Sequence, residues 1–234
     1  MRLLIVRHAE SHSNVSRRVL SSTDLPLTDK GIRQAEATKN YLNDLLGPSG
    51  FRHVYSSPLL RARQTAAIIA GDMAAIEECR ELREMELGLI EGLTWEEKAT
   101  LYPGVNFEDR LSRISIPGGE AFGDVKARAL GFMERLCPDD EGDVLVVSHG
   151  ITIRVLVNCL LGKEDHCVDR LHWADNASVT EIVVKPPSDA ALKRLNHRGH
   201  LTALGLGNED YEKWGLFAQE DYMGDAGIRA GEGD

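Results

Sequence analysis

Two histidines, two arginines and one glutamate in this chain are of the types that transfer a phosphoryl group. A neutral imidazole attacks phosphorus without a metal ion near neutral pH, and His8 is our candidate nucleophile. Negative charge spreads over the oxygens of a transferring phosphoryl group, so cations and N–H donors stabilise it. We expect Arg7, Arg61 and His149 to supply such donors. Glu84 is the candidate proton donor for the leaving oxygen, a role that requires burial or a nearby phosphate.

Taken singly, each of these residues also has an ordinary structural explanation. A lone histidine in the position of His8 often caps a helix or fills a core, and arginines are mostly solvated surface charges. Ser148-His149-Gly150 fits a plain turn from strand to helix, although the free N–H groups of such a turn also bind anions. Glu84 is one charge among several in residues 81–86. The functional interpretation therefore depends on the fold bringing these residues to one site.

Short apolar runs that end at these polar residues predict buried strands. Residues 3–6 run into Arg7-His8, residues 51–55 precede the turn that carries Arg61, and residues 144–147 run into His149. Helical spacing and closing apolar runs predict further elements: helices over 32–46, 59–71, 120–136 and 151–161, and strands over 179–184 and 192–195. Strands that alternate with helices predict an α/β fold, a three-layer αβα sandwich with a mostly parallel central sheet. Ligands bind at the carboxyl ends of strands in such sheets, which is where the candidate residues fall.

The domain organisation predicted is one domain over residues 1–207 and a C-terminal tail over 208–234. Within the domain, residues 84–119 lack strand periodicity and are rich in glycine and proline, so we expect a loop-and-helix insertion that covers the site. The candidates for the walls of the pocket are residues 20–23, Trp95, Phe107, Arg110 and Trp173. The tail is rich in glycine, aspartate and glutamate and is predicted to pack poorly.

The composition limits the kinds of binding partner and the cellular compartment that we expect. The 234 residues carry a formal net charge of −10, which disfavours nucleic acid and anionic membranes as partners. No stretch approaches the roughly 18 apolar residues of a membrane span, and the start of the chain is too short of apolar residues for a signal peptide. The scattered cysteines fit reduced thiols and a cytoplasmic protein; they are Cys79, Cys137, Cys159 and Cys167.

Several motifs, taken in order, resemble those of the histidine phosphatase superfamily, also called the phosphoglycerate mutase-like family. The resemblance covers residues 2 to about 201. The motifs that carry it are Leu4-Ile5-Val6-Arg7-His8-Ala9-Glu10-Ser11 with Asn14, Pro26-Leu27-Thr28, Ser56-Ser57-Pro58-Leu59 with Arg61, Glu84 with Gly88, Glu91 and Gly92, Gly118-Gly119-Glu120, Val146-Val147-Ser148-His149-Gly150, and Asn176-Ala177-Ser178.

The resemblance implies roles that agree with the chemistry above. His8 would carry the phosphoryl group, Glu84 would donate the proton, and Arg7, Arg61 and His149 would hold the phosphate. The family also implies that Asn14 and the backbone of Gly150 line the pocket, and that neither a metal nor a cofactor is used. Its fold is a sheet sandwiched by helices, with the insertion shaping specificity.

Three departures from the family pattern bear on these expectations. Ala9 replaces the usual glycine after Arg-His, which is tolerable if the backbone there has a negative φ. Leu20-Ser21 replaces an expected polar-Gly pair, so we expect Ser21 or Ser22 to take over as a substrate-binding donor. Ala121 replaces the serine after Gly-Gly-Glu, and Glu120 is expected to cap the following helix rather than to touch substrate.

The function expected is hydrolysis of a phosphomonoester through a phosphohistidine, acting on a small phosphorylated metabolite, either broadly or on a sugar or glycerate phosphate, and releasing inorganic phosphate. A mutase would use the same phosphohistidine, but the segment at 92–97 is short and acidic, whereas such mutases carry a longer basic segment. A non-catalytic module that binds a phospho-ligand is a further alternative. A metal hydrolase is disfavoured because the chain lacks a His-Glu-x-x-His motif. The sequence leaves the oligomeric state open, a homodimer included.

Overall fold

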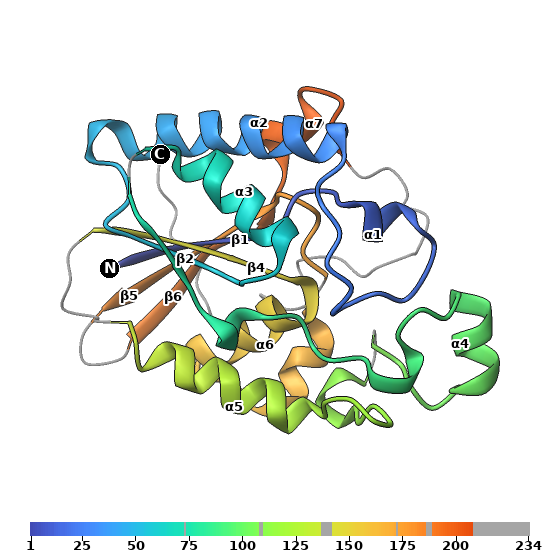
Figure 1. Ribbon diagram of the computed structural model, residues 1–234. Helices are drawn as coiled ribbons and strands as arrows, with labels where there is room; N and C mark the ends of the chain where they lie inside the picture. The colour runs from blue at the N-terminus through green and yellow to red at the C-terminus, as the bar shows by residue number, and fades with distance from the viewer. Residues whose placement is uncertain (73, 108–109, 137–141, 172, 186–188, 208–234) are drawn as a thin grey trace.

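A six-stranded sheet forms the centre of the computed structural model of the protein (Figure 1). The structure describes residues 1–72, 74–107, 110–136, 142–171, 173–185 and 189–207. The strands lie in the order β3-β2-β4-β1-β5-β6. Their bounds are β1 Arg2–Arg7, β2 His53–Ser56, β3 Ile76–Glu78, β4 Asp143–Ser148, β5 Val179–Lys185 and β6 Asp189–His197. The β1, β2, β3 and β4 strands are parallel, and β5 runs antiparallel to both of its neighbours.

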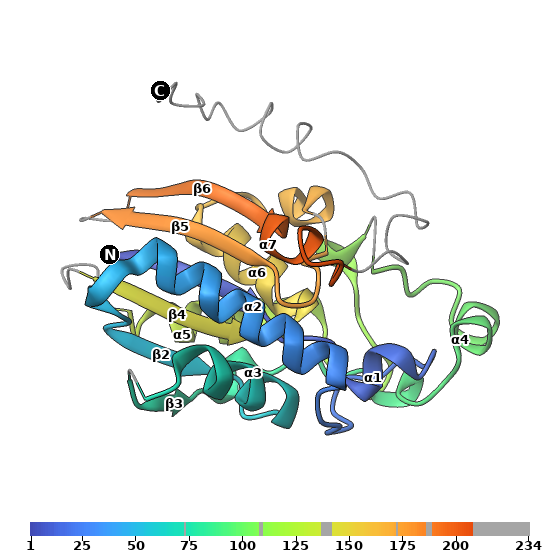
Figure 2. The same cartoon turned by 90° about the horizontal axis from the view of Figure 1, so that it is seen from above.

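Helices cover both faces of this sheet. Figures 1 and 2 show α2, α3 and α7 on one face and α5 and α6 on the other, while α1 and α4 lie at the end of the molecule where β1 and β4 finish. The helix bounds are α1 His12–Val15, α2 Asp29–Leu46, α3 Leu60–Ala70, α4 Trp95–Leu101, α5 Phe122–Met133, α6 Gly150–Leu160 and α7 Gly199–Thr202. Short 3-10 turns lie at Gly47–Ser49, Arg80–Leu82, Gly88–Ile90, Leu111–Arg113 and Asp165–Arg170.

The central strands are apolar throughout because both of their faces are buried. On β1, Leu3 and Ile5 pack in the cluster that includes the α5 and α6 side chains. Leu4 and Val6, which alternate with them, pack in a second cluster with α2 and α3. Successive side chains of a strand point to opposite faces, so one apolar run fills two core layers. The three-layer α/β prediction is confirmed.

Three elements were not predicted, because their sequences lack the apolar run or the helical periodicity that predicts a strand or a helix. The β3 strand has the sequence Ile-Glu-Glu and is largely exposed, so it shows no apolar run. The α1 and α7 helices each span four residues, about one turn, which is too short for helical periodicity to register. Of the three, α7 still contributes a core side chain, Leu201, which is 1% exposed.

The predicted insertion contains the 3-10 turn Gly88–Ile90, helix α4 and the 3-10 turn Leu111–Arg113. Thr94 begins α4 by accepting a hydrogen bond from the Glu97 backbone N–H, and the Glu97 carboxylate accepts one from the Thr94 N–H. The predicted tail, residues 208–234, lies outside the described residues, as does Cys137. The described cysteines, Cys79, Cys159 and Cys167, are free thiols.

The expectation that Glu120 caps α5 is wrong. Ala121 occupies the N-cap position, and the Asp124 carboxylate accepts the Ala121 N–H at 2.8 Å. Glu120 instead pairs with Arg128 at 2.8 Å and accepts the backbone N–H of Glu86 at 2.9 Å. Because Arg128 lies two turns along α5, this carboxylate ties the helix to the insertion.

Gly31, in the first turn of α2, provides a test of how tightly this helix meets the loop after β1. A Cβ atom at Gly31 would lie 1.9 Å from the Glu10 carbonyl oxygen, whereas a Cβ at Gly131 of α5 would meet nothing within 4 Å. We expect Gly31→Ala to lower the free energy of unfolding by about 2 kcal/mol or more despite the better helix propensity of alanine. Gly131→Ala, the matched control, should raise the free energy of unfolding by about 0.5 to 1 kcal/mol. Urea denaturation measures both, and equal effects would contradict the close approach.

Candidate active site

The candidate residues meet where three neighbouring parallel strands end. Arg7 is the last residue of β1, and the His8 N–H continues the pairing by donating to the Ser148 carbonyl at 2.9 Å. His149 follows β4 directly and is the N-cap of α6. Arg61 lies in the first turn of α3, which follows β2 after a short turn. Because β2, β4 and β1 are adjacent and parallel, their carboxyl ends bring these side chains together.

The two histidines and two arginines form a compact buried cluster. The His8 and His149 ring centroids are 5.0 Å apart. The Nε of Arg61 lies 3.3 Å from Nε2 of His8. Arg7 and His8 are 6% and 4% exposed, and Arg61 and His149 are 2% and 0% exposed. Charges that are buried to this extent interact more strongly than charges in water.

The imidazole of His8 is held in one tautomer. Its Nδ1 lies 2.8 Å from the Ala9 carbonyl oxygen, which can only accept a hydrogen bond. Nδ1 therefore carries the hydrogen, and Nε2, next to Arg61, keeps its lone pair. Ala9 itself is buried, its φ is not positive, and its N–H donates to Thr65 Oγ1 at 3.0 Å, so alanine fits where the family has glycine.

Both imidazoles are kept neutral. Burial lowers the pKa of His8 well below 6.5, and the guanidinium groups of Arg61 and Arg7 lower it further, while the Ala9 hydrogen bond opposes them. Burial, followed by Arg61 and then His8, likewise lowers the pKa of His149 well below its usual value. An unprotonated His8 is the form that attacks phosphorus, so the site favours the reactive form near neutral pH.

His149 has one ring nitrogen engaged and one available. Its Nε2 lies 2.7 Å from Ser57 Oγ, a residue of the turn between β2 and α3. Its Nδ1 is buried and makes no hydrogen bond within the part of the chain that the structure describes. Buried nitrogens are seldom left unsatisfied, and such an atom beside two arginines suits contact with an anion. Ser57 was part of the sequence motif, but its role as a partner of His149 was not predicted.

A loop before β5 holds the Arg7-His8 pair from the other side. The Nη1 of Arg7 donates to the Ala174 carbonyl at 2.6 Å, and the Asn176 side chain donates to the His8 carbonyl at 2.9 Å. Ala177 donates its N–H to the Arg7 carbonyl at 3.0 Å and has a φ of 59°. The Asn-Ala-Ser motif marked this loop in the sequence. Its task of fixing the catalytic strand end was not predicted.

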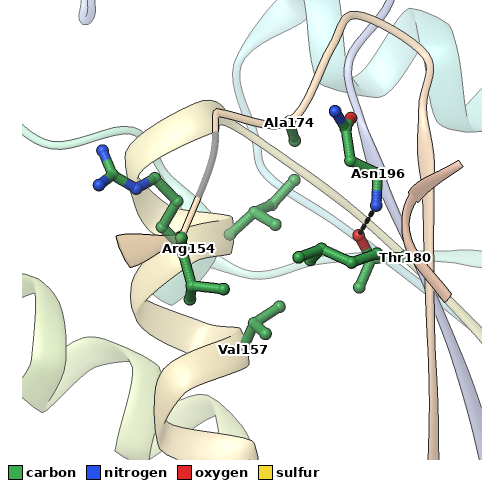
Figure 3. A pocket seen from close by; sticks show the side chains of 8 residues that line it. Arg154, Val157, Ala174, Thr180 and Asn196 are labelled. Carbon is green, nitrogen blue, oxygen red and sulfur yellow. Dashed lines mark hydrogen bonds between the residues drawn. The ribbon is translucent and has the colours of Figure 1, made fainter. Parts of the chain in front are cut away.

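A small cavity of about 10 Å³ lies behind this loop, between α6 and the strands β5 and β6 (Figure 3). It has room for about one water molecule, so it is not a substrate site. Arg154 borders it, with its guanidinium turned away toward carbonyl oxygens of Phe107 at 2.7 Å and Val168 at 3.0 Å. The Asn196 N–H donates to Thr180 Oγ1 across the far wall at 3.1 Å.

Asn14, in α1, is tied to the loop before β5. Its amide oxygen accepts from the Ser11 N–H at 2.9 Å and from the Asn176 side chain at 3.3 Å. These contacts use the oxygen, so the NH2 group of Asn14 is the end that can donate to an anion. Asn176 thereby links Asn14 to the His8 backbone.

Glu84 lies at the N-terminus of α6, next to the catalytic cluster. Its carboxylate accepts the N–H groups of Ile151 and Thr152, both at 3.2 Å, and that of Met85 at 2.9 Å. A Cβ at Gly150 would lie 3.8 Å from a Glu84 oxygen and 2.6 Å from the Trp173 ring, so Gly150 has to lack a side chain. The carboxylate thus uses helix N–H groups that also suit a phosphate.

Ser21 does not serve as a substrate donor in this structure. Its hydroxyl donates to the Met85 carbonyl, and its N–H donates to the Glu91 carboxylate at 3.0 Å. Its carbonyl accepts from Nη2 of Arg61 at 2.7 Å. Every polar group of Ser21 is therefore used inside the protein, and the expectation of a phosphate-binding hydroxyl is corrected to a residue that holds Arg61. Ser22, the alternative donor, is exposed, and its side chain makes no hydrogen bond to another described residue.

The insertion meets the site through aromatic rings. Phe107 of the insertion and Trp173 lie edge to face with ring centroids 6.4 Å apart, and the Arg154 guanidinium lies 5.6 Å from the Trp173 ring centroid. Arg110, which was also predicted to line the pocket wall, borders a separate surface hollow of about 440 Å³ together with Tyr102 and Arg113.

Within the described ranges, no group of three or more histidine, cysteine, aspartate or glutamate side chains could hold a metal ion. No helix in those ranges is both long enough and apolar enough to cross a membrane.

Comparison with known proteins identifies the family. The sequence profile of the histidine phosphatase superfamily (branch 1) matches residues 3–198, most of the chain. The chain belongs to this superfamily. The family prediction made from the motifs is confirmed, and this histidine phosphatase-type chain carries the cluster described above at the position of the family's leading Arg-His motif.

Relatives of this superfamily member include proteins named for two activities. It is 33% identical over 160 residues to phosphoglycerate mutase-like protein 4 of Arabidopsis thaliana, covering 66% of this chain and 68% of the relative. It resembles the crystal structure of mycobacterial glucosyl-3-phosphoglycerate phosphatase in complex with VO3, with a TM-score of 0.75, 27% identity and coverage of 84% and 99%. It also resembles the alpha-ribazole phosphatase of Shigella flexneri, with a TM-score of 0.72, 27% identity and coverage of 84% and 96%. The chain spans 55% of the length of a bifunctional protein of Mycobacterium tuberculosis that it matches at 33% identity.

The neutral state of His8 and His149 predicts how stability responds to acid. Both pKa values lie well below 6.5 in the folded chain, so below pH 6.5 the unfolded chain binds protons that the folded chain does not. Their contribution to stability is complete above pH 6.5 and is lost as the pH falls toward the folded pKa values. We expect each histidine to lower the free energy of unfolding by up to about 1.4 kcal/mol per pH unit in this range. Urea denaturation between pH 7.5 and 5 measures the slope. His149→Gln should reduce this slope by the contribution of one histidine. An unchanged slope in this variant would contradict a neutral His149 in the folded chain.

Proposed function

We propose that this protein hydrolyses phosphomonoesters of small metabolites through a covalent phosphate on Nε2 of His8. The observation that carries the proposal is the fixed tautomer of His8, whose Nδ1 lies 2.8 Å from the Ala9 carbonyl while Nε2 lies 3.3 Å from Arg61. Membership of the histidine phosphatase superfamily supports it, as do structural neighbours named as phosphatases of phosphorylated metabolites. The protein is on these grounds a phosphomonoesterase.

In the first step, Nε2 of His8 attacks phosphorus and the ester P–O bond breaks. Arg7, Arg61, His149 and the N–H of Gly150 stabilise the charge on the phosphoryl oxygens, and Asn14 donates its NH2 group. The leaving alkoxide takes a proton from Glu84. The negative charge of a bound phosphoryl group next to Glu84 favours the protonated carboxyl that this step requires.

In the second step, a water molecule attacks the phosphorus of phospho-His8 and the P–N bond breaks. Glu84, now ionised, accepts a proton from this water, and inorganic phosphate is released. His8 returns to its neutral form with the hydrogen still on Nδ1. Glu84 returns to its starting state, so the cycle consumes one ester and one water and needs no metal ion.

The substrate class follows from the burial of the cluster and from the neighbours. The nucleophile is 4% exposed, so a phosphoryl group on a small or slender molecule reaches it more readily than one on a folded protein surface. The neighbours are named for glucosyl-3-phosphoglycerate and alpha-ribazole phosphate, which are small phosphorylated metabolites. A metabolite of this kind is the proposed substrate.

Phosphoryl transfer of the mutase type is the second candidate, because the Arabidopsis relative carries that name. A mutase would return the phosphoryl group from His8 to another hydroxyl instead of to water. Measuring phosphate release from phosphoglycerate with and without a bisphosphate primer separates the two. Release without primer supports hydrolysis, while isomerisation that depends on the primer would establish the mutase.

His8→Ala tests the nucleophile. We expect it to lower the hydrolysis of p-nitrophenyl phosphate by at least about a thousandfold, because no other imidazole can form the covalent intermediate. Acid-labile, base-stable phosphate should be trapped on rapid quenching of the wild type and be missing from this variant. His12→Ala, at an exposed histidine of α1, is the control and should retain both activities. A trapped phosphate in the His8 variant would overturn the assignment.

Glu84→Gln tests the proton donor. A poor leaving group needs a proton as its bond breaks, whereas p-nitrophenolate does not. We expect hydrolysis of an alkyl phosphate to fall by about a hundredfold or more and that of p-nitrophenyl phosphate to fall much less. Glu86→Gln, at a half-exposed carboxylate that pairs with Arg83, is the matched control. Equal losses for both substrates would remove Glu84 from this role.

A further inference from the structure

The guanidinium of Arg61 is held by a loop that has no regular structure of its own. Its Nη2 donates to the Ser21 carbonyl at 2.7 Å and its Nη1 donates to the Thr23 carbonyl at 3.3 Å. With Nε directed at His8, three of the five N–H donors of Arg61 are engaged, and two remain for an anion. The direction of those two is set by the positions of the Ser21 and Thr23 carbonyls.

One carboxylate of the insertion fixes these same two residues. Glu91 accepts the N–H of Ser21 on both oxygens, at 3.0 and 3.1 Å. It also accepts the N–H of Thr23 at 3.0 Å and the Thr23 hydroxyl at 2.8 Å. The N–H groups of Ser21 and Thr23 thus point to Glu91, while their carbonyls point to Arg61.

The neighbouring backbone reinforces this contact. Gly92 donates its N–H to the Val19 carbonyl at 2.8 Å, and Val19 donates its own to the Leu93 carbonyl at 2.9 Å. Gly92 has a φ of 86°, a backbone shape that suits glycine, and it follows Glu91 directly. The loop at 19–23 therefore takes its shape from the segment at 91–93 and not from a helix or strand.

The charge of Glu91 also favours the positively charged form of Arg61. Burial lowers the pKa of the Arg61 guanidinium, and the carboxylates of Glu84, Asp24 and Glu91 oppose that shift. Glu91 stabilises the charged arginine from a distance, with two peptide units between them, so it does not occupy the donors that an anion needs. A carboxylate in direct contact would neutralise the cation.

We infer that Glu91 is a positioning residue that sets the direction of the Arg61 guanidinium through the backbone of Ser21 and Thr23, and so places the insertion in control of one phosphate contact. The inference rests on the proposed function, since it concerns how Arg61 meets the phosphoryl group. It assigns to the insertion a part in the alignment of the cluster, beyond covering the site.

The test compares Glu91→Gln with Glu96→Gln. Glu91→Gln keeps the size of the side chain and removes its charge, whereas Glu96 is an exposed residue of α4 and serves as the control. We expect Glu91→Gln to lower kcat/KM for p-nitrophenyl phosphate about tenfold and to weaken inhibition by vanadate by a similar factor, as loss of an orienting partner does elsewhere. The control should keep both within about twofold of wild type, the usual spread for a surface change. Thr23→Val, which removes one donor from the loop side, should act in the same direction but less.

A double-mutant cycle separates positioning from general structural support. With Arg61 changed to Lys, which lacks the planar fork, the additional effect of Glu91→Gln should shrink to less than about twofold. An undiminished effect in that background, or no effect of Glu91→Gln on kcat/KM and vanadate inhibition in the wild-type background, would overturn the inference. Binding of inorganic phosphate by calorimetry reports on Arg61 without turnover. A wild type that binds phosphate more tightly than Glu91→Gln but hydrolyses nothing would contradict the proposed function and leave the positioning role standing.

Discussion

The site depends on burial that keeps the imidazoles of His8 and His149 neutral beside the guanidinium groups of Arg7 and Arg61. Burial alone lowers the pKa of His8 and His149, and the adjacent arginines lower both further. A protonated His8 would lose its nucleophilic lone pair and add a third positive charge to the cluster. The same burial that strengthens the interactions of the arginines therefore keeps the imidazole of His8 in the form that the proposed mechanism needs.

The arginines are held mainly by carbonyl groups, which orient a cation without cancelling its charge. Arg7 donates to the Ala174 carbonyl, and Arg61 donates to those of Ser21 and Thr23. Each of these carbonyls belongs to a loop, and each loop is fixed in turn by other side chains. The strands determine only the backbone positions of Arg7, His8 and His149. The orientation of the guanidinium groups is determined by the surrounding loops.

The insertion takes part in this arrangement at two points. Glu91 binds the loop that holds Arg61, and Phe107 lies against Trp173, whose ring closely approaches Gly150 at the start of α6. Buried Arg154 joins these parts by donating to the Phe107 carbonyl while its guanidinium lies near the Trp173 ring. A change of sequence in the insertion can therefore alter both the loop that holds Arg61 and the ring that lies against Gly150.

The sequence by itself determined the layered α/β architecture and the set of candidate residues that the fold brings together. Apolar runs that end in Arg7-His8 and Ser148-His149 report strands buried on both faces, and their ends must meet in a parallel sheet. The helices with a full apolar stripe were predicted for the same reason. Each of these features is encoded by neighbours along the chain, through the alternation of side chains on strands and the 3.6-residue repeat of helices.

Only the tertiary structure decided which partners orient the reactive groups. The tautomer of His8, the Ser57 contact of His149, the engagement of Ser21 inside the protein and the pairing of Glu120 with Arg128 all depend on specific hydrogen bonds. Those of His149 and Ser21 join residues far apart in the chain. Hydrogen bonds of this kind leave no periodic signal, because a single polar side chain fits a solvated surface as well as a buried contact. The candidate residues and the strand ends that carry them could be read from the sequence, whereas the geometry in which they meet follows from tertiary packing.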